Sequence, residues 1–143
     1  MLCGQLVNYG HSSLTRGLEK SFPNQVITYP VSENLMNSSA MGLAMCGMRT
    51  IVLHERFDFA VVGMSPLVNE IPIYQGKLPI VFLIIVGHGK GQGPQQNKDF
   101  THWFYSMYSV FEPHNPKAAY EQMKHALSLD SPSMVIIHRN LYD

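Results

Sequence analysis

Short apolar runs alternate with amphipathic or small-residue stretches along the whole chain. The runs are nearly continuously apolar, which is typical of parallel strands whose two faces are both covered by helices. A half-exposed sheet would instead show strict alternation of apolar and polar residues. We therefore predict strands at residues 1–7, 25–30, 49–55, 79–86, 109–113 and 134–140.

Helical patterns occupy the intervals between these runs. Asn115 can cap the last helix and Pro116 suits its first position, and an apolar stripe follows them. The alternating order predicts a doubly wound α/β fold, with a mostly parallel six-stranded sheet and helices on both faces. Ligands of such sheets bind at the carboxyl ends of the strands. The predicted helices cover residues 13–22, the run after Glu33, and residues 59–73, 100–107 and 116–129.

Composition narrows the class of protein. The 143 residues suit one domain, and ten basic residues balance ten acidic ones without forming a basic stripe, so we expect no nucleic-acid partner. Cys3 and Cys46 form no spaced framework, which favours a reducing compartment and offers no metal site. The apolar run at 78–87 is too short to span a bilayer and no leader is visible. We expect a cytoplasmic protein without a membrane partner.

Glu33 is a carboxylate at the head of a long run of small and apolar residues, in a chain with only 14% charged residues. It follows the predicted strand 25–30, where a ligand would bind. A second interpretation is that Glu33 only stabilises the first turn of a helix. The helix carries small residues, which suit either a subunit interface or a buried core. These small residues are Ala40, Gly42, Ala44 and Gly47.

The segments VSEN, AMGLAMCGMRTIV and RFDFA occur in this order between residues 31 and 60 and match a known pattern without an insertion or deletion. They resemble the pyrimidine-binding domain of 2-oxo acid dehydrogenase beta subunits and, more distantly, of transketolases. The most specific features are Glu33, the G-x-A-x-x-G helix and the F-x-F motif after it. The resemblance extends from YGHSSLTRGLEKSFP to VIIHRN, which is most of the chain.

This resemblance implies a site for thiamine diphosphate. Glu33 would be the catalytic carboxylate that hydrogen-bonds the 1′ nitrogen of the aminopyrimidine and stabilises its imino tautomer. Phe59 would pack on the pyrimidine ring. In the family the helix after Glu33 lies near the subunit contact that encloses the cofactor, so the resemblance implies that Ala44 belongs to an interface. Phe57 is either a second ring contact or a core residue, and we favour the core. Glu55 is a second carboxylate near a strand end, for which we favour a solvated position.

The loop GHGKGQGPQQNKDF departs from the family pattern. Relatives carry a histidine over the substrate here, and a gapless match places Gln96 at that position. Glutamine can hydrogen-bond but cannot carry a proton near neutral pH. His88 and His102 are candidate substitutes, and an ordinary loop or helix-surface histidine explains them as well. A phosphate-loop interpretation of the same glycines fails because Lys90 is followed by Gly91 rather than by Ser or Thr.

The family also needs a diphosphate-binding domain with a metal motif, and no such motif occurs in this sequence. We therefore expect residues 1–143 to be a single pyrimidine-binding domain, without a diphosphate domain or a C-terminal transketolase domain. A partner subunit would bind the diphosphate through Mg²⁺ or Ca²⁺ in a hetero-oligomer, a dimer of heterodimers.

Three functions remain open from the sequence. The first is the pyrimidine-binding subunit of a split, transketolase-like enzyme that makes or breaks a carbon–carbon bond next to a carbonyl. The substrate would be a small molecule, through ketol transfer or 2-oxo acid decarboxylation. The second is a non-catalytic assembly or regulatory domain that keeps the fold. The third is an unrelated flavodoxin-like binding module.

Overall fold

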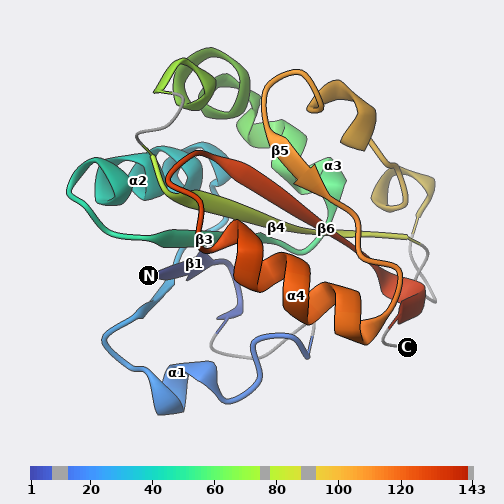
Figure 1. The fold of residues 1–143 in the computed structure, drawn as a ribbon, viewed down its shortest axis with the longest axis horizontal. Coiled ribbons are helices and arrows are strands. Elements are labelled where there is room, and N and C mark those ends of the chain that lie inside the picture. Colours follow the sequence, from blue (N-terminus) through green and yellow to red (C-terminus); the bar gives the residue numbers. More distant parts are fainter. Residues whose placement is uncertain (8–12, 75–77, 88–92, 142–143) are drawn as a thin grey trace.

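The computed structural model describes residues 1–7, 13–74, 78–87 and 93–141, which form one six-stranded, wholly parallel sheet (Figure 1). The strand order is β2-β1-β3-β4-β6-β5. All predicted strands are present, and each is shorter than predicted. Their bounds are β1 Leu2–Gly4, β2 Val26–Thr28, β3 Thr50–His54, β4 Ile80–Val86, β5 Ser109–Phe111 and β6 Ser133–His138.

Helices cover both faces of this sheet (Figure 1). On one face lie α2 (Glu33–Met45) and α3 (Phe57–Ala60) with the short turns that follow it. On the other lie α1 (Leu18–Ser21) and α4 (Pro116–Ala126). The predicted doubly wound α/β class is confirmed. The turns are η2 Val61–Gly63, η3 Pro66–Glu70, η4 Ile71–Tyr74, η5 Pro94–Gln96, η6 Thr101–Trp103 and η7 Arg139–Leu141.

The interior strands β4 and β6 explain the continuously apolar runs. Phe82 and Ile84 point into the core beneath α2 and α3, whereas Val81 packs on the opposite face beneath α4. Side chains of a strand alternate between faces, and both faces are buried here, so every position is apolar. The edge strands β2 and β5 are only partly buried and shorter.

The N-terminus of α2 is capped by Ser32, whose hydroxyl accepts a hydrogen bond from Leu35 N at 3.4 Å. Ala40 and Ala44 pack into the core and are 0% and 3% exposed, while Met45 on the outer face is 58% exposed. The prediction that Ala44 belongs to an interface stripe is therefore wrong. The small side chains of Ala40 and Ala44 let the helix lie close to its own sheet.

The last helix follows its sequence signals closely. The Asn115 side chain accepts a hydrogen bond from Ala118 N at 2.8 Å, and Pro116 occupies the first turn. Its apolar stripe packs on the sheet through Ala119, Met123, Ala126 and Leu127.

Three other predicted helices are broken or shortened. The segment 13–22 forms turns before the four-residue α1, and 100–107 contains only the 3₁₀ turn η6. The segment 59–73 is divided among α3, η2, η3 and η4, and Pro66 and Pro72 lie within these turns. Proline lacks the amide that continues a helix, which accounts for the division of this last segment.

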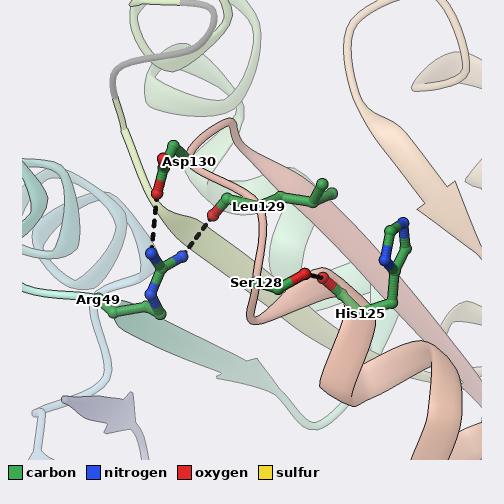
Figure 2. Close-up of polar contacts among 5 residues, drawn as sticks. All are labelled: Arg49, His125, Ser128, Leu129 and Asp130. Carbon is green, nitrogen blue, oxygen red and sulfur yellow. Dashed lines mark hydrogen bonds and ion pairs between the residues drawn. The ribbon is translucent and has the colours of Figure 1, made fainter.

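Arg49, just before β3, connects the amino-terminal end of this strand to the turn before β6 (Figure 2). Its guanidinium donates to Leu129 O and lies 2.8 Å from Asp130 Oδ1 in the turn between α4 and β6. Ser128 Oγ donates to His125 O at 2.7 Å in the same turn. Asp130 is largely exposed, so we expect its ion pair to add little stability. This end of β3 lies opposite the carboxyl ends of the strands.

Within the described parts of the chain, none of the helices has both the length and the apolar character needed to cross a bilayer.

Candidate functional site

A cavity of about 270 Å³ opens at the carboxyl ends of β1 and β3, beside the first turns of α2 and α3. This is the edge of a parallel sheet at which ligands bind in doubly wound folds. Four successive residues of the segment that ends β3 contribute to it. Its lining consists of Gln5, Leu6, Glu33, Met36, Leu53, His54, Glu55, Arg56, Phe59 and Gln96.

Glu33 is the first residue of α2 and its side chain reaches this cavity. The residue is 7% exposed, and Gln5 Nε2 donates a hydrogen bond to its Oε1 at 3.2 Å. Ser32, and not Glu33, caps the helix. The carboxylate of Glu33 is therefore free to face the cavity at the strand ends. Glu33 is therefore both the first residue of a helix and a buried carboxylate that lines a cavity.

The two phenylalanines of the F-x-F motif have different environments. Phe59 is half-buried and lines the cavity with Glu33. Phe57 is 1% exposed and stacks on Phe104 with ring centroids 5.6 Å apart, and it does not line the cavity. The favoured assignment of Phe57 to the core agrees with this placement, so Phe59 is the aromatic candidate for a ligand.

Gln96 also reaches the cavity, from the turn η5 after β4. Lys98 N lies 3.4 Å from Asp58 Oδ2, and this contact joins the loop to α3 beside Phe59. His102 is exposed on η6, contacts the Trp103 ring, and does not line the cavity. Of the candidate loop residues, the structure brings only Gln96 to Glu33; His88 lies outside the described residues.

Sequence reasoning missed several residues of the cavity. Glu55 is 9% exposed and lines it, so the expectation of a solvated strand-end residue is wrong. Arg56 is 7% exposed, and its Nη1 donates to Glu55 O. Gln5 and His54 were missed because each follows or ends an apolar strand with no motif around it. Their position at the carboxyl ends of β1 and β3 was the available signal.

His54 is a buried neutral imidazole. Desolvation lowers its pKa from the ordinary 6.5 to about 3. Asn37 Nδ2 donates to Gly63 O at 3.1 Å, so Asn37 Oδ1 faces His54 Nε2 at 2.9 Å. A carbonyl oxygen only accepts, and Nε2 is therefore the protonated ring nitrogen. The cavity wall thus contains a fixed histidine tautomer.

We predict that acid destabilises the protein through His54. Between pH 6.5 and 3 the unfolded chain binds a proton at this residue and the folded chain does not. Stability therefore falls as pH falls through this window, by roughly 1 kcal/mol per pH unit. Urea unfolding at pH 7, 6, 5 and 4 measures the slope, and His54→Phe should reduce it. An unchanged slope in the variant would assign the acid sensitivity to other groups.

The family described as "Transketolase, pyrimidine binding domain" matches residues 2–143. The chain belongs to this family. The resemblance predicted from Glu33, the glycine helix and the F-x-F motif is confirmed.

Relatives of this pyrimidine-binding domain are beta subunits. It is 26% identical over 142 residues to the mitochondrial "Pyruvate dehydrogenase E1 component subunit beta" of Pisum sativum. It is 27% identical over 141 residues to the "Acetoin:2,6-dichlorophenolindophenol oxidoreductase subunit beta" of Cupriavidus necator. The alignments cover 93% of this chain in both cases, and 40% and 42% of the relatives. The pyrimidine-binding domain therefore spans less than half the length of these proteins.

Solved structures share the fold of this domain. A chain described as "Split gene transketolase, inactive beta4 tetramer" superimposes with a TM-score of 0.76 at 17% identity, covering 96% of this chain and 45% of that one. A putative thiamin diphosphate-dependent enzyme from Mycobacterium smegmatis gives 0.70 at 15% identity, covering 99% and 28%. At these identities the likeness establishes the parallel sheet and its helices.

Proposed function

We propose that this chain is the pyrimidine-binding subunit of a thiamine diphosphate enzyme that makes or breaks a carbon–carbon bond next to a carbonyl. The observation that carries the proposal is the buried carboxylate of Glu33 in one cavity with the half-buried ring of Phe59. Because the chain belongs to the transketolase pyrimidine-binding family, we interpret Glu33 and Phe59 as contacts for a pyrimidine ring. The reaction would be either ketol transfer or 2-oxo acid decarboxylation.

The residues of the cavity suit an aminopyrimidine. Met36, Leu53 and Phe59 provide apolar walls for a flat ring, and Glu33 is one of several polar side chains that line the same cavity. A flat ring that carries hydrogen-bonding nitrogens matches a lining of both kinds. The cavity therefore fits the heterocyclic end of the cofactor.

Each residue has a defined task in this proposal. Glu33 holds a proton between its carboxylate and the ring nitrogen, and the low local dielectric of a buried site strengthens that hydrogen bond. Gln5 orients the carboxylate through Oε1. Phe59 packs on the ring face and excludes water. When bound, thiamine diphosphate supplies an electron sink for the reacting carbonyl carbon.

The diphosphate requires a second protein surface in this proposal. Among the described residues no group of three or more His, Cys, Asp or Glu could hold a metal ion. A partner subunit would supply Mg²⁺ or Ca²⁺ and the diphosphate site, and two such pairs would form a dimer of heterodimers. The relative described as a split-gene transketolase supports a divided enzyme. Both cysteines are free thiols, which supports a cytoplasmic location.

We predict that this chain alone binds thiamine diphosphate and Mg²⁺ weakly, with a Kd above about 100 μM, because a pyrimidine ring alone provides few contacts. Isothermal calorimetry on the purified chain measures this. Adding the partner subunit, identified by copurification, should produce tight binding that depends on magnesium. Tight, magnesium-dependent binding by the single chain would contradict the divided site.

A non-catalytic assembly or regulatory role is the alternative, and Gln96 favours it. This side chain lies in the cavity at the position where the family resemblance expects a histidine, and an amide cannot transfer a proton near neutral pH. Turnover of the assembled complex after replacement of Glu33 distinguishes the catalytic function from the regulatory one. A regulatory domain would assemble with its partner and leave turnover unchanged when Glu33 is replaced.

A further inference from the structure

The backbone of Gly63 rests directly on Glu33. A Cβ atom built on Gly63 would lie 3.0 Å from Glu33 C and 3.1 Å from Glu33 Cβ. It would also lie 2.5 Å from Asn37 Nδ2, closer than real Cβ contacts come. Glycine is therefore needed at this position for close approach, so η2 supports the first turn of α2 from outside the cavity.

Asn37 links this contact to the sheet. It lies one turn after Glu33 on α2 and is 0% exposed. Its Nδ2 donates to Gly63 O at 3.1 Å, and its Oδ1 lies 2.9 Å from His54 Nε2. One amide thus joins α2, η2 and the carboxyl end of β3. Buried polar groups connected in this way hold their elements in a single arrangement.

His54 is itself held rigidly. It is the last residue of β3, pairs in register with Ile84 of β4, and is 2% exposed. Its ring stacks on Phe82 with centroids 6.4 Å apart and an interplanar angle of 18°. The network therefore ends on β3, a strand inside the sheet.

We propose that Gly63, Asn37 and His54 are positioning residues that fix the carboxylate of Glu33. The proposal rests on the function proposed above, which makes Glu33 the catalytic group. Gly63 lies against Glu33, and Gly63 and His54 both hold the side chain of Asn37 one turn later, so a shift of either should move Glu33 relative to Gln5. The 3.2 Å hydrogen bond from Gln5 Nε2 to Glu33 Oε1 reports that position without any cofactor.

The first experiment compares Gly63→Ala with Gly42→Ala in the full chain. Gly42 lies on the exposed face of α2 and a Cβ there meets nothing within 4 Å, so it is a matched control. The ¹⁵N resonance of the Gln5 side-chain amide is recorded, with Glu33→Ala as the reference for a lost carboxylate. Gly63→Ala should move the resonance toward that reference, and Gly42→Ala should leave it unchanged. A folded Gly63→Ala variant with the wild-type resonance would overturn the proposal.

The second experiment tests His54 and decides the matter if Gly63→Ala does not fold. His54→Phe keeps the ring but removes the donor to Asn37. His54→Gln places an amide nitrogen near the position of Nε2 and restores a donor. The Gln5 resonance should move in the first variant and return in the second. Equal resonances in these two variants would show that His54 does not position Glu33.

In the reconstituted enzyme, Gly63→Ala and His54→Phe should displace Glu33 and lower kcat on the order of tenfold to a hundredfold, as small misplacements of catalytic groups do. Glu19→Gln, which changes an exposed carboxylate of α1 away from the cavity, should retain wild-type kcat. The amide measurement needs neither partner nor cofactor, so it separates the two proposals. An unmoved Gln5 resonance rejects the positioning network, whereas full activity of Glu33→Gln rejects the catalytic role of Glu33.

Discussion

Glu33→Gln should lower the turnover of the reconstituted enzyme by at least about a hundredfold, because a neutral amide cannot accept and hold the proton at the ring nitrogen. The fold and the assembly should remain intact, since glutamine has the same shape and can still hydrogen-bond Gln5. Turnover is assayed with a 2-oxo acid and with a ketose as donors. Sedimentation velocity measures assembly in parallel.

The matched control for this variant is Glu19→Gln. Glu19 is an exposed carboxylate in the first turn of α1, away from the cavity, so its loss should leave turnover unchanged. Near wild-type turnover by Glu33→Gln would show that the carboxylate is not catalytic. It would favour the assembly or regulatory function instead.

Ala44→Trp should destabilise the isolated chain by about 3 kcal/mol or more, at or beyond the usual range for overpacked cores. Ala44 is 3% exposed among the buried side chains under α2, so an indole would force the helix away from the sheet. Urea unfolding followed by circular dichroism measures the change in the free energy of unfolding.

Met45→Trp is the control, because Met45 is the next residue along α2 and is 58% exposed. Its substitution should change stability by no more than about 0.5 kcal/mol. If the two variants had the same stability, Ala44 would not be a core residue. The original interface interpretation of the small-residue stripe would then return.

The sequence alone determined the fold class and the central pair of site residues. β4 and β6 are recognisable because a strand buried on both faces must be apolar at every position. The start of α4 is recognisable because Asn115 and Pro116 act through local backbone chemistry. Glu33 and Phe59 were identified because the motif carrying them is continuous, and the structure brings both to one cavity.

The remaining cavity residues, the orientation of Ala44 and the contact of Gly63 were decided by tertiary structure, because they depend on which strands and helices become neighbours. Residue 5 is about fifty positions away from residues 54 and 56 in the sequence, and they meet because β1 and β3 pair in parallel and end at the same edge of the sheet. Whether Ala44 faces the sheet or another chain is likewise invisible to composition, since alanine suits both environments. The contact of Gly63 with Glu33 arises from the packing of η2 on α2, which no local sequence pattern specifies.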